Sequence, residues 1–163
     1  MDLKRINAAS HISRWRGWTN RPYSILEHMV VGVEVMADMG MPVEDQRWFL
    51  LHDMHETEII GDVPTPDKML YCNTLFHAAC QEFDNALMSR QRVPVRNGRV
   101  VKAMDKDMMI VEHHCIASRR YDDFPALDVD NAVHLAIHVR LEWPQGDVRR
   151  RWLTQAARLG VVV

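Results

Sequence analysis

The sequence has few of the features that a disulfide-stabilised domain needs. Its 163 residues include three cysteines, Cys72, Cys80 and Cys115, which show no CxxC spacing and cannot all pair within one chain. We therefore do not expect a disulfide framework, and we expect a reducing, cytoplasmic setting. An apolar core must then hold the fold together.

Long apolar runs and an excess of basic residues are also missing. No run approaches the ~20 apolar residues of a membrane span, and the first residues lack the apolar stretch and cleavage site of a signal peptide. The formal net charge is −2, so the chain lacks the basic footprint that long nucleic acid requires. These absences predict no membrane span, no long nucleic acid as partner, and a small molecule as ligand.

Signals for β-strands are scarce, whereas apolar residues recur at helical spacing over most of the chain. The length fits one domain, residues 1–163, and we find no repeat or linker that divides it. The sequence thus predicts an all-α, single-domain helical bundle of about six to seven helices. The helices predicted from apolar spacing cover residues 23–39, 43–53, 67–90, 99–119, 128–142 and 145–158.

The most informative residues are polar ones at positions where a core-facing helix is normally apolar. His52 and Asp53 end the apolar run 48–51, His28 lies on the preceding helix, and Asp105 interrupts the apolar pattern of the helix that starts near residue 99. A lone histidine there is most simply a satisfied core residue. An imidazole and a carboxylate together are costly unless something satisfies them, and a divalent cation does so. We predict one His-His-Asp-Asp metal site.

Two longer strings accompany this set. Residues 52–56 read HDMHE, of the form HDxxE, and residues 61–68 read GDVPTPDK, of the form GDxPTPxK. With Arg14-Trp15 before them and Asp105 after them, the segment from about Arg14 to Asp105 resembles the HD-domain metal-dependent phosphohydrolase superfamily. Within it, the likeness is to the small bacterial and phage 5′-deoxynucleotidase-like branch, which includes phage dATP triphosphohydrolases. Residues 113–163 match no motif that we can use.

The resemblance implies a role for each matching residue. The four metal-site residues become the ligands of an HD-type fold, and Glu56 and Asp62 position or activate the attacking water. Arg14 and Trp15 grip the phosphate and the deoxyribose, with the tryptophan disfavouring a 2′-hydroxyl. Lys68 contacts a phosphate or the base. These roles are expectations from the likeness, although a divalent ion, a nearby carboxylate and a planar guanidinium also suit phosphoester hydrolysis on physical grounds.

Each of these residues also has an interpretation without chemistry. Glu56 could complement a helix dipole, and Asp62 could be a turn residue. Arg14 and Lys68 could be ordinary solvated charges. For Trp15 the alternative is core packing. Core packing is also the role that we expect for Trp18.

Two pairs of histidines lie outside the motifs. They are the pair His113-His114 and the i,i+4 pair His134/His138. No carboxylate or cysteine at matching spacing supports a second metal site there, so we expect structural or surface roles.

The combined pattern predicts an enzyme that hydrolyses a 2′-deoxyribonucleoside 5′-phosphate at the α-phosphorus, as a 5′-deoxynucleotidase or a dNTP triphosphohydrolase. Its cofactor would be a divalent ion, and the ligand types suit Mn, Co, Zn, Fe or Mg without selecting one. The alternatives are a non-catalytic nucleotide-binding HD module and an HD phosphodiesterase acting on a cyclic nucleotide or a nucleic-acid end. Apolar residues after Arg120 are compatible with a homo-oligomer.

Overall fold

The computed structural model describes residues 1–59, 61–63, 74–94, 98–119, 121–142 and 146–163. These parts contain seven α-helices and no strand, which confirms the all-α prediction. In chain order the helices are α1 (Leu3–His11), the 3-10 helix η1 (Arg14–Gly17), α2 (Ile25–Asp38), α3 (Val43–Phe49), the 3-10 helix η2 (Met54–Thr57), α5 (Thr74–Arg90), α6 (Arg99–Cys115), α7 (Ala132–Glu142) and α8 (Val148–Leu159).

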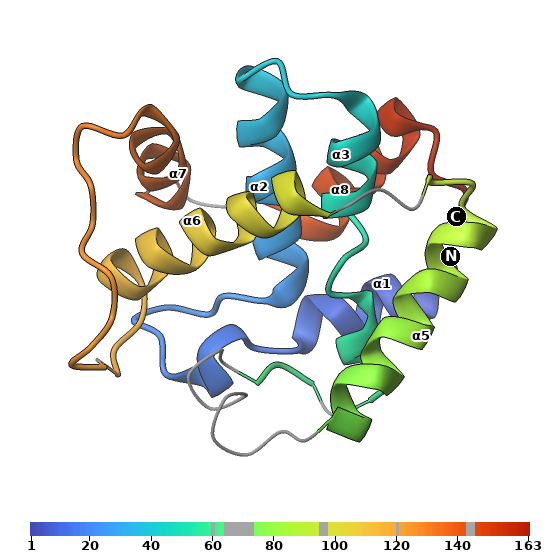
Figure 1. The fold of residues 1–163 in the computed structure, drawn as a ribbon, viewed down its shortest axis with the longest axis horizontal. Coiled ribbons are helices and arrows are strands. Elements are labelled where there is room, and N and C mark those ends of the chain that lie inside the picture. Colours follow the sequence, from blue (N-terminus) through green and yellow to red (C-terminus); the bar gives the residue numbers. More distant parts are fainter. Residues whose placement is uncertain (60, 64–73, 95–97, 120, 143–145) are drawn as a thin grey trace.

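Helix α2 is the centre of the bundle (Figure 1). It packs against α1, α3, α6, α7 and α8, and 11 of its 14 residues are buried. The Ser24 side chain caps its first turn by accepting the N–H of Glu27. A Cβ atom at Gly32 would lie 2.1 Å from Phe49 Cε1, so the glycine lets α3 approach the backbone of α2 closely. This packing brings the end of α3 beside the middle of α2.

The helix predicted over residues 43–53 is shorter than expected. Helix α3 ends at Phe49, and residues 50–53 form a turn before η2 begins at Met54. His52 Nδ1 donates to the Phe49 carbonyl at 2.7 Å, which satisfies a carbonyl that helix continuation would otherwise use. His52 and Asp53 therefore lie on a turn and not on a helix.

The other predicted helices are present with shifted ends. The prediction for residues 23–39 corresponds to α2, and α6 ends at Cys115 instead of residue 119. Helix α7 begins at Ala132 instead of 128, and residues 67–73 of the predicted long helix lie outside the described residues. Helix α1 was not predicted, because its buried face consists of Ile6 and Ala9 alone, too few apolar residues to produce a periodic signal.

The expectation that Trp18 packs in the core is wrong. Trp18 is 57% exposed. Its backbone makes contacts with the rest of the fold, because its N–H donates to Trp15 O and its carbonyl accepts the N–H of Ser118. None of the helices in the described parts of the chain combines the length and the apolarity needed to cross a bilayer.

Candidate metal centre

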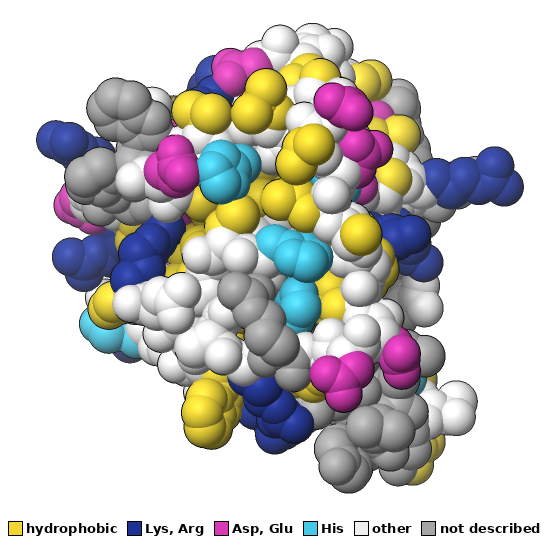
Figure 2. Space-filling model, turned by 90° about the vertical axis from the view of Figure 1, so that its left-hand side faces the viewer, with side chains coloured by type: hydrophobic (Ala, Val, Ile, Leu, Met, Phe, Trp, Pro, Cys, Tyr) yellow, Lys and Arg dark blue, Asp and Glu magenta, His cyan; other side chains and the backbone are white. Residues whose placement is uncertain are grey.

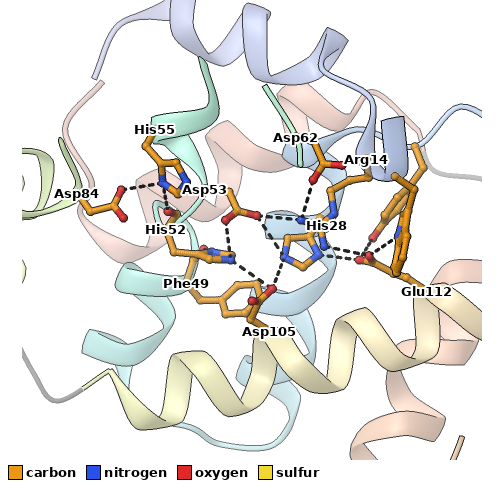
Figure 3. Close-up of polar contacts among 12 residues, drawn as sticks. Arg14, His28, Phe49, His52, Asp53, His55, Asp62, Asp84, Asp105 and Glu112 are labelled. Carbon is orange, nitrogen blue, oxygen red and sulfur yellow. Dashed lines mark hydrogen bonds and ion pairs between the residues drawn. The ribbon is translucent and has the colours of Figure 1, made fainter. Parts of the chain in front are cut away.

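The four predicted metal ligands come together at one point (Figure 3). His28 projects from α2, His52 and Asp53 from the turn between α3 and η2, and Asp105 from α6. Each offers one ligand atom, and these four atoms all lie within 4.8 Å of one another. The chain thus brings two imidazoles and two carboxylates from three separate segments to a single, largely buried location.

The distances inside the cluster are those of groups that face a common centre. His28 Nε2 lies 3.2 Å from Asp105 Oδ1 and 3.7 Å from Asp53 Oδ2. His52 Nε2 lies 3.3 Å from Asp53 Oδ1 and 3.6 Å from Asp105 Oδ1. Both Nε2 atoms are buried, and neither makes a hydrogen bond of acceptable geometry. An unsatisfied buried polar atom costs about 1–3 kcal/mol, and a cation coordinated by both nitrogens would remove that cost.

The other ring nitrogen of each histidine is anchored. His28 Nδ1 donates to Glu112 Oε1 at 2.6 Å, and His52 Nδ1 donates to the carbonyl of Phe49 at 2.7 Å. Such an acceptor fixes both the tautomer and the ring orientation, leaving Nε2 as the nitrogen that is available to a metal. The chemistry of the donor set, two Nε2 atoms and two carboxylates, therefore fits a divalent cation.

The electrostatics of the cluster keep its carboxylates ionised. Burial favours a protonated Asp53, but His52, Arg14 and His28 outweigh it and lower the pKa of Asp53 to about 2. Burial likewise opposes charge on His52, but the carboxylates of Asp53 and Asp105 raise its pKa to about 9. A metal ion that binds Nε2 at neutral pH would therefore have to displace a proton from His52.

Asp53 lies between His52 and Arg14. Arg14 is buried, with 8% of its surface exposed. Its Nη1 donates to Asp53 Oδ2 at 3.1 Å and lies 3.5 Å from Asp62 Oδ1, and its Nη2 donates to Glu112 Oε2 at 3.1 Å. These carboxylates together outweigh burial and raise the pKa of Arg14 well above its ordinary value. Any phosphate that Arg14 binds must compete with them.

Trp15 is buried beside the cluster, with 4% of its surface exposed. Its Nε1 donates to Glu112 Oε2 at 3.1 Å. Its ring lies among His113, Tyr121 and Phe124, with centroid distances of 5.8, 6.4 and 5.9 Å. The Trp15 ring is thus packed inside an aromatic group and is not an exposed surface.

Of the remaining predicted residues, Glu56 and Asp62 lie near the cluster. Glu56 is buried on η2, and it offers an oxygen that lies within 4.8 Å of atoms from Asp53 and His55. Asp62 faces Arg14, with its side chain 3% exposed. Lys68 lies outside the described residues.

Sequence reasoning missed Glu112, which is completely buried on α6. It follows Asp105 by seven residues, which is two helical turns, so both carboxylates lie on one face of α6. This spacing was the available signal. It could not identify the partners of Glu112, because these come from segments 84 to 98 residues away.

A cavity of about 320 Å³ lies between α5 and α6 and reaches the cluster. Three of the four candidate ligands, His52, Asp53 and Asp105, line it, and Asp105 has the most exposed side chain of the four, at 41%. Trp48 and Lys102 also line this cavity. A small ligand in it would therefore have direct access to the metal position.

Comparisons with family models, with curated proteins and with solved structures gave no match for this chain. The geometry of the cluster and the motifs in the sequence are therefore the features that bear on its function.

Proposed function

We propose that this chain is a metal-dependent phosphohydrolase that cleaves 2′-deoxyribonucleoside 5′-phosphates at the α-phosphorus and releases the deoxynucleoside. The observation that carries the proposal is the convergence of His28, His52, Asp53 and Asp105, whose ligand atoms lie within 4.8 Å of one another. A structural metal site is normally closed by its protein ligands, whereas this one opens into a cavity.

A divalent ion at this position would supply a Lewis acid for a phosphoryl oxygen and would make a bound water more acidic. The chain supplies the other groups. Glu56 is buried one short turn after Asp53. In this proposal its carboxylate would orient a water and accept its proton. Asp62 and Asp53 both contact the Arg14 guanidinium and hold it beside the cluster.

The cavity between α5 and α6 provides room for the rest of a substrate. Its volume of about 320 Å³ is at the lower end of the range for small-molecule sites. Trp48 offers an aromatic surface in this cavity, and Lys102, three residues before Asp105 on α6, offers a cation suited to a phosphate. The preference for deoxyribose over ribose rests on the resemblance carried by Arg14-Trp15.

The test is nucleoside release from a panel of dNMPs and dNTPs, with the matching ribonucleotides, each with Mn²⁺, Co²⁺, Mg²⁺ or Zn²⁺. We expect turnover of at least one deoxynucleotide, giving phosphate from a monophosphate or tripolyphosphate from a triphosphate. Turnover of none would refute the proposal. Tight nucleotide binding without turnover would indicate a regulatory module, and cleavage of only cyclic nucleotides or oligonucleotides would indicate a phosphodiesterase.

Glu56→Gln tests the assignment of the base. We expect a loss of about 10²–10⁴-fold in rate with the fold and the metal retained. Glu58→Gln is the matched control, because Glu58 lies two residues away, and its side chain is 44% exposed and pairs with Arg5. Equal activity of the two variants would remove Glu56 from the mechanism.

A further inference from the structure

Glu112 is a buried carboxylate whose two oxygens each accept two hydrogen bonds (Figure 3). Oε1 accepts from His28 Nδ1 at 2.6 Å and from the Tyr23 hydroxyl at 2.9 Å. Oε2 accepts from Arg14 Nη2 and from Trp15 Nε1, both at 3.1 Å. Although burial opposes its charge, Arg14 and His28 lower the pKa of Glu112 to about 2, so it is ionised at neutral pH.

The donors to Glu112 belong to two different parts of the site. His28 is a candidate metal ligand, whereas Arg14 and Trp15 begin η1, the single 3-10 turn Arg14–Gly17. In this turn Trp15 and Arg16 have φ angles of 56° and 53°, in the left-handed region that side-chain-bearing residues rarely adopt. The local sequence therefore does not favour this turn, and contacts from outside must hold it. Glu112 provides two of these contacts.

We propose that Glu112 is a positioning residue that couples metal binding at His28 to the conformation of the Arg14–Gly17 turn. A cation on Nε2 of His28 makes its Nδ1–H a stronger donor and strengthens the hydrogen bond to Oε1. The carboxylate is thereby fixed in the orientation in which Oε2 holds the turn. The proposed function assigns this turn to substrate binding, so the coupling would order it when the metal is present.

Coupling between two sites is reciprocal, so loosening the turn must weaken metal binding. Trp15→Phe removes one donor to Oε2, and none of the contacts described for Trp15 is to a candidate metal ligand. We expect the affinity for Zn²⁺, measured by competition with a chromogenic chelator, to fall about 3- to 10-fold. Trp18→Phe is the control, because Trp18 is 57% exposed, and its affinity should equal that of the wild type. Equal affinities in both variants would overturn the proposal.

The effect of metal binding on the turn is measured on the Trp15 indole. In a ¹⁵N-labelled sample its Nε1–H signal is identified by its loss in Trp15→Phe. We expect this signal to move when Zn²⁺ is added to the wild type. In Glu112→Gln an amide NH₂ replaces an oxygen that accepts two donors, so the signal should no longer respond, and Zn²⁺ affinity should fall about 10–100-fold.

The results separate this proposal from the proposed function, since neither measurement depends on turnover. A wild-type protein that binds Zn²⁺ without moving the Trp15 signal would refute the coupling, and one that does not bind Zn²⁺ would refute the metal centre with it. If Glu112→Gln does not fold, the Trp15→Phe and Trp18→Phe pair still decides, because both side chains lie outside the metal-binding group.

Discussion

Two regions of this protein are rich in histidine, and they use it differently. In the central cluster, the Nε2 atoms of His28 and His52 face Asp53 and Asp105 without a hydrogen bond of acceptable geometry. The second region is the end of α6 together with α7. Figure 2 shows that face of the molecule, with histidine and hydrophobic side chains at the surface.

At the α6–α7 end the histidines bond to nearby groups. His134 Nδ1 accepts the N–H of Asp128, and its Nε2 lies 3.3 Å from Asp107 Oδ1. His138 Nδ1 lies 3.0 Å from Cys115 Sγ, and its Nε2 lies 2.9 Å from a Glu142 oxygen. Within the described ranges, no group of three or more potential ligands converges there as in the centre. Convergence of ring nitrogens and carboxylates on one point, and not the number of histidines, sets the central cluster apart.

The largest expected difference between the regions is in their response to a metal ion. An ion at 1,000 times its Kd adds about 4 kcal/mol to the free energy of unfolding. For a domain of this length that corresponds to a Tm increase of roughly 8–16 °C, removed by a chelator. Hydrogen exchange should slow in α2 and in residues 50–57 and change little in α7. Equal protection of both regions would argue against a central site.

A matched pair of substitutions on α6 sharpens the comparison. Asp105→Asn should lower metal affinity by more than the ~10–100-fold typical of outer-shell residues, because it removes a ligand charge. Asp107→Asn, two residues away, removes the charge that faces His134 and should leave affinity unchanged. Isothermal titration with Mn²⁺ or Zn²⁺ measures both. Similar losses in the two variants would contradict the assignment of Asp105.

Metal binding should also depend on pH. Because the pKa of His52 is raised to about 9, this residue holds a proton below that pH, and the metal must displace it. Affinity should therefore rise with pH between 6.5 and 8.5, by about tenfold or ~1.4 kcal/mol per unit for one released proton. Titrations in buffers of different ionisation enthalpy count the protons. An affinity that does not change with pH would show that the metal displaces no proton from His52.

The smallest effect is expected in the α6–α7 region itself. His134→Gln should lower the free energy of unfolding by about 1 kcal/mol, because it disturbs its contacts with Asp107 and Asp128. Metal affinity and turnover should be unchanged. Denaturant unfolding measures the stability loss, and a loss of metal binding in this variant would extend the site to α7.

The sequence predicted the helical class and the four converging residues, but not how they are held. Helix ends were least accurate where a side chain competes with the helix, as His52 does at Phe49. The partners of Arg14 and Trp15 could not be predicted either. Both were expected to grip substrate, and in the structure both donate to Glu112, a residue 97 or 98 positions away.

The sequence by itself determined most of the helical segments after residue 23 and where polar residues interrupt apolar stripes, because periodicity depends on neighbours a few residues apart. Only the tertiary structure decided that His28, on α2, meets the carboxylates of Asp53 and Asp105, and that Glu112 orients it. Those contacts depend on how α2, α3 and α6 pack, for instance on the close approach at Gly32. Packing between distant segments leaves no local pattern in the chain, so the contacts that hold and orient these side chains are decided only when the helices are in place.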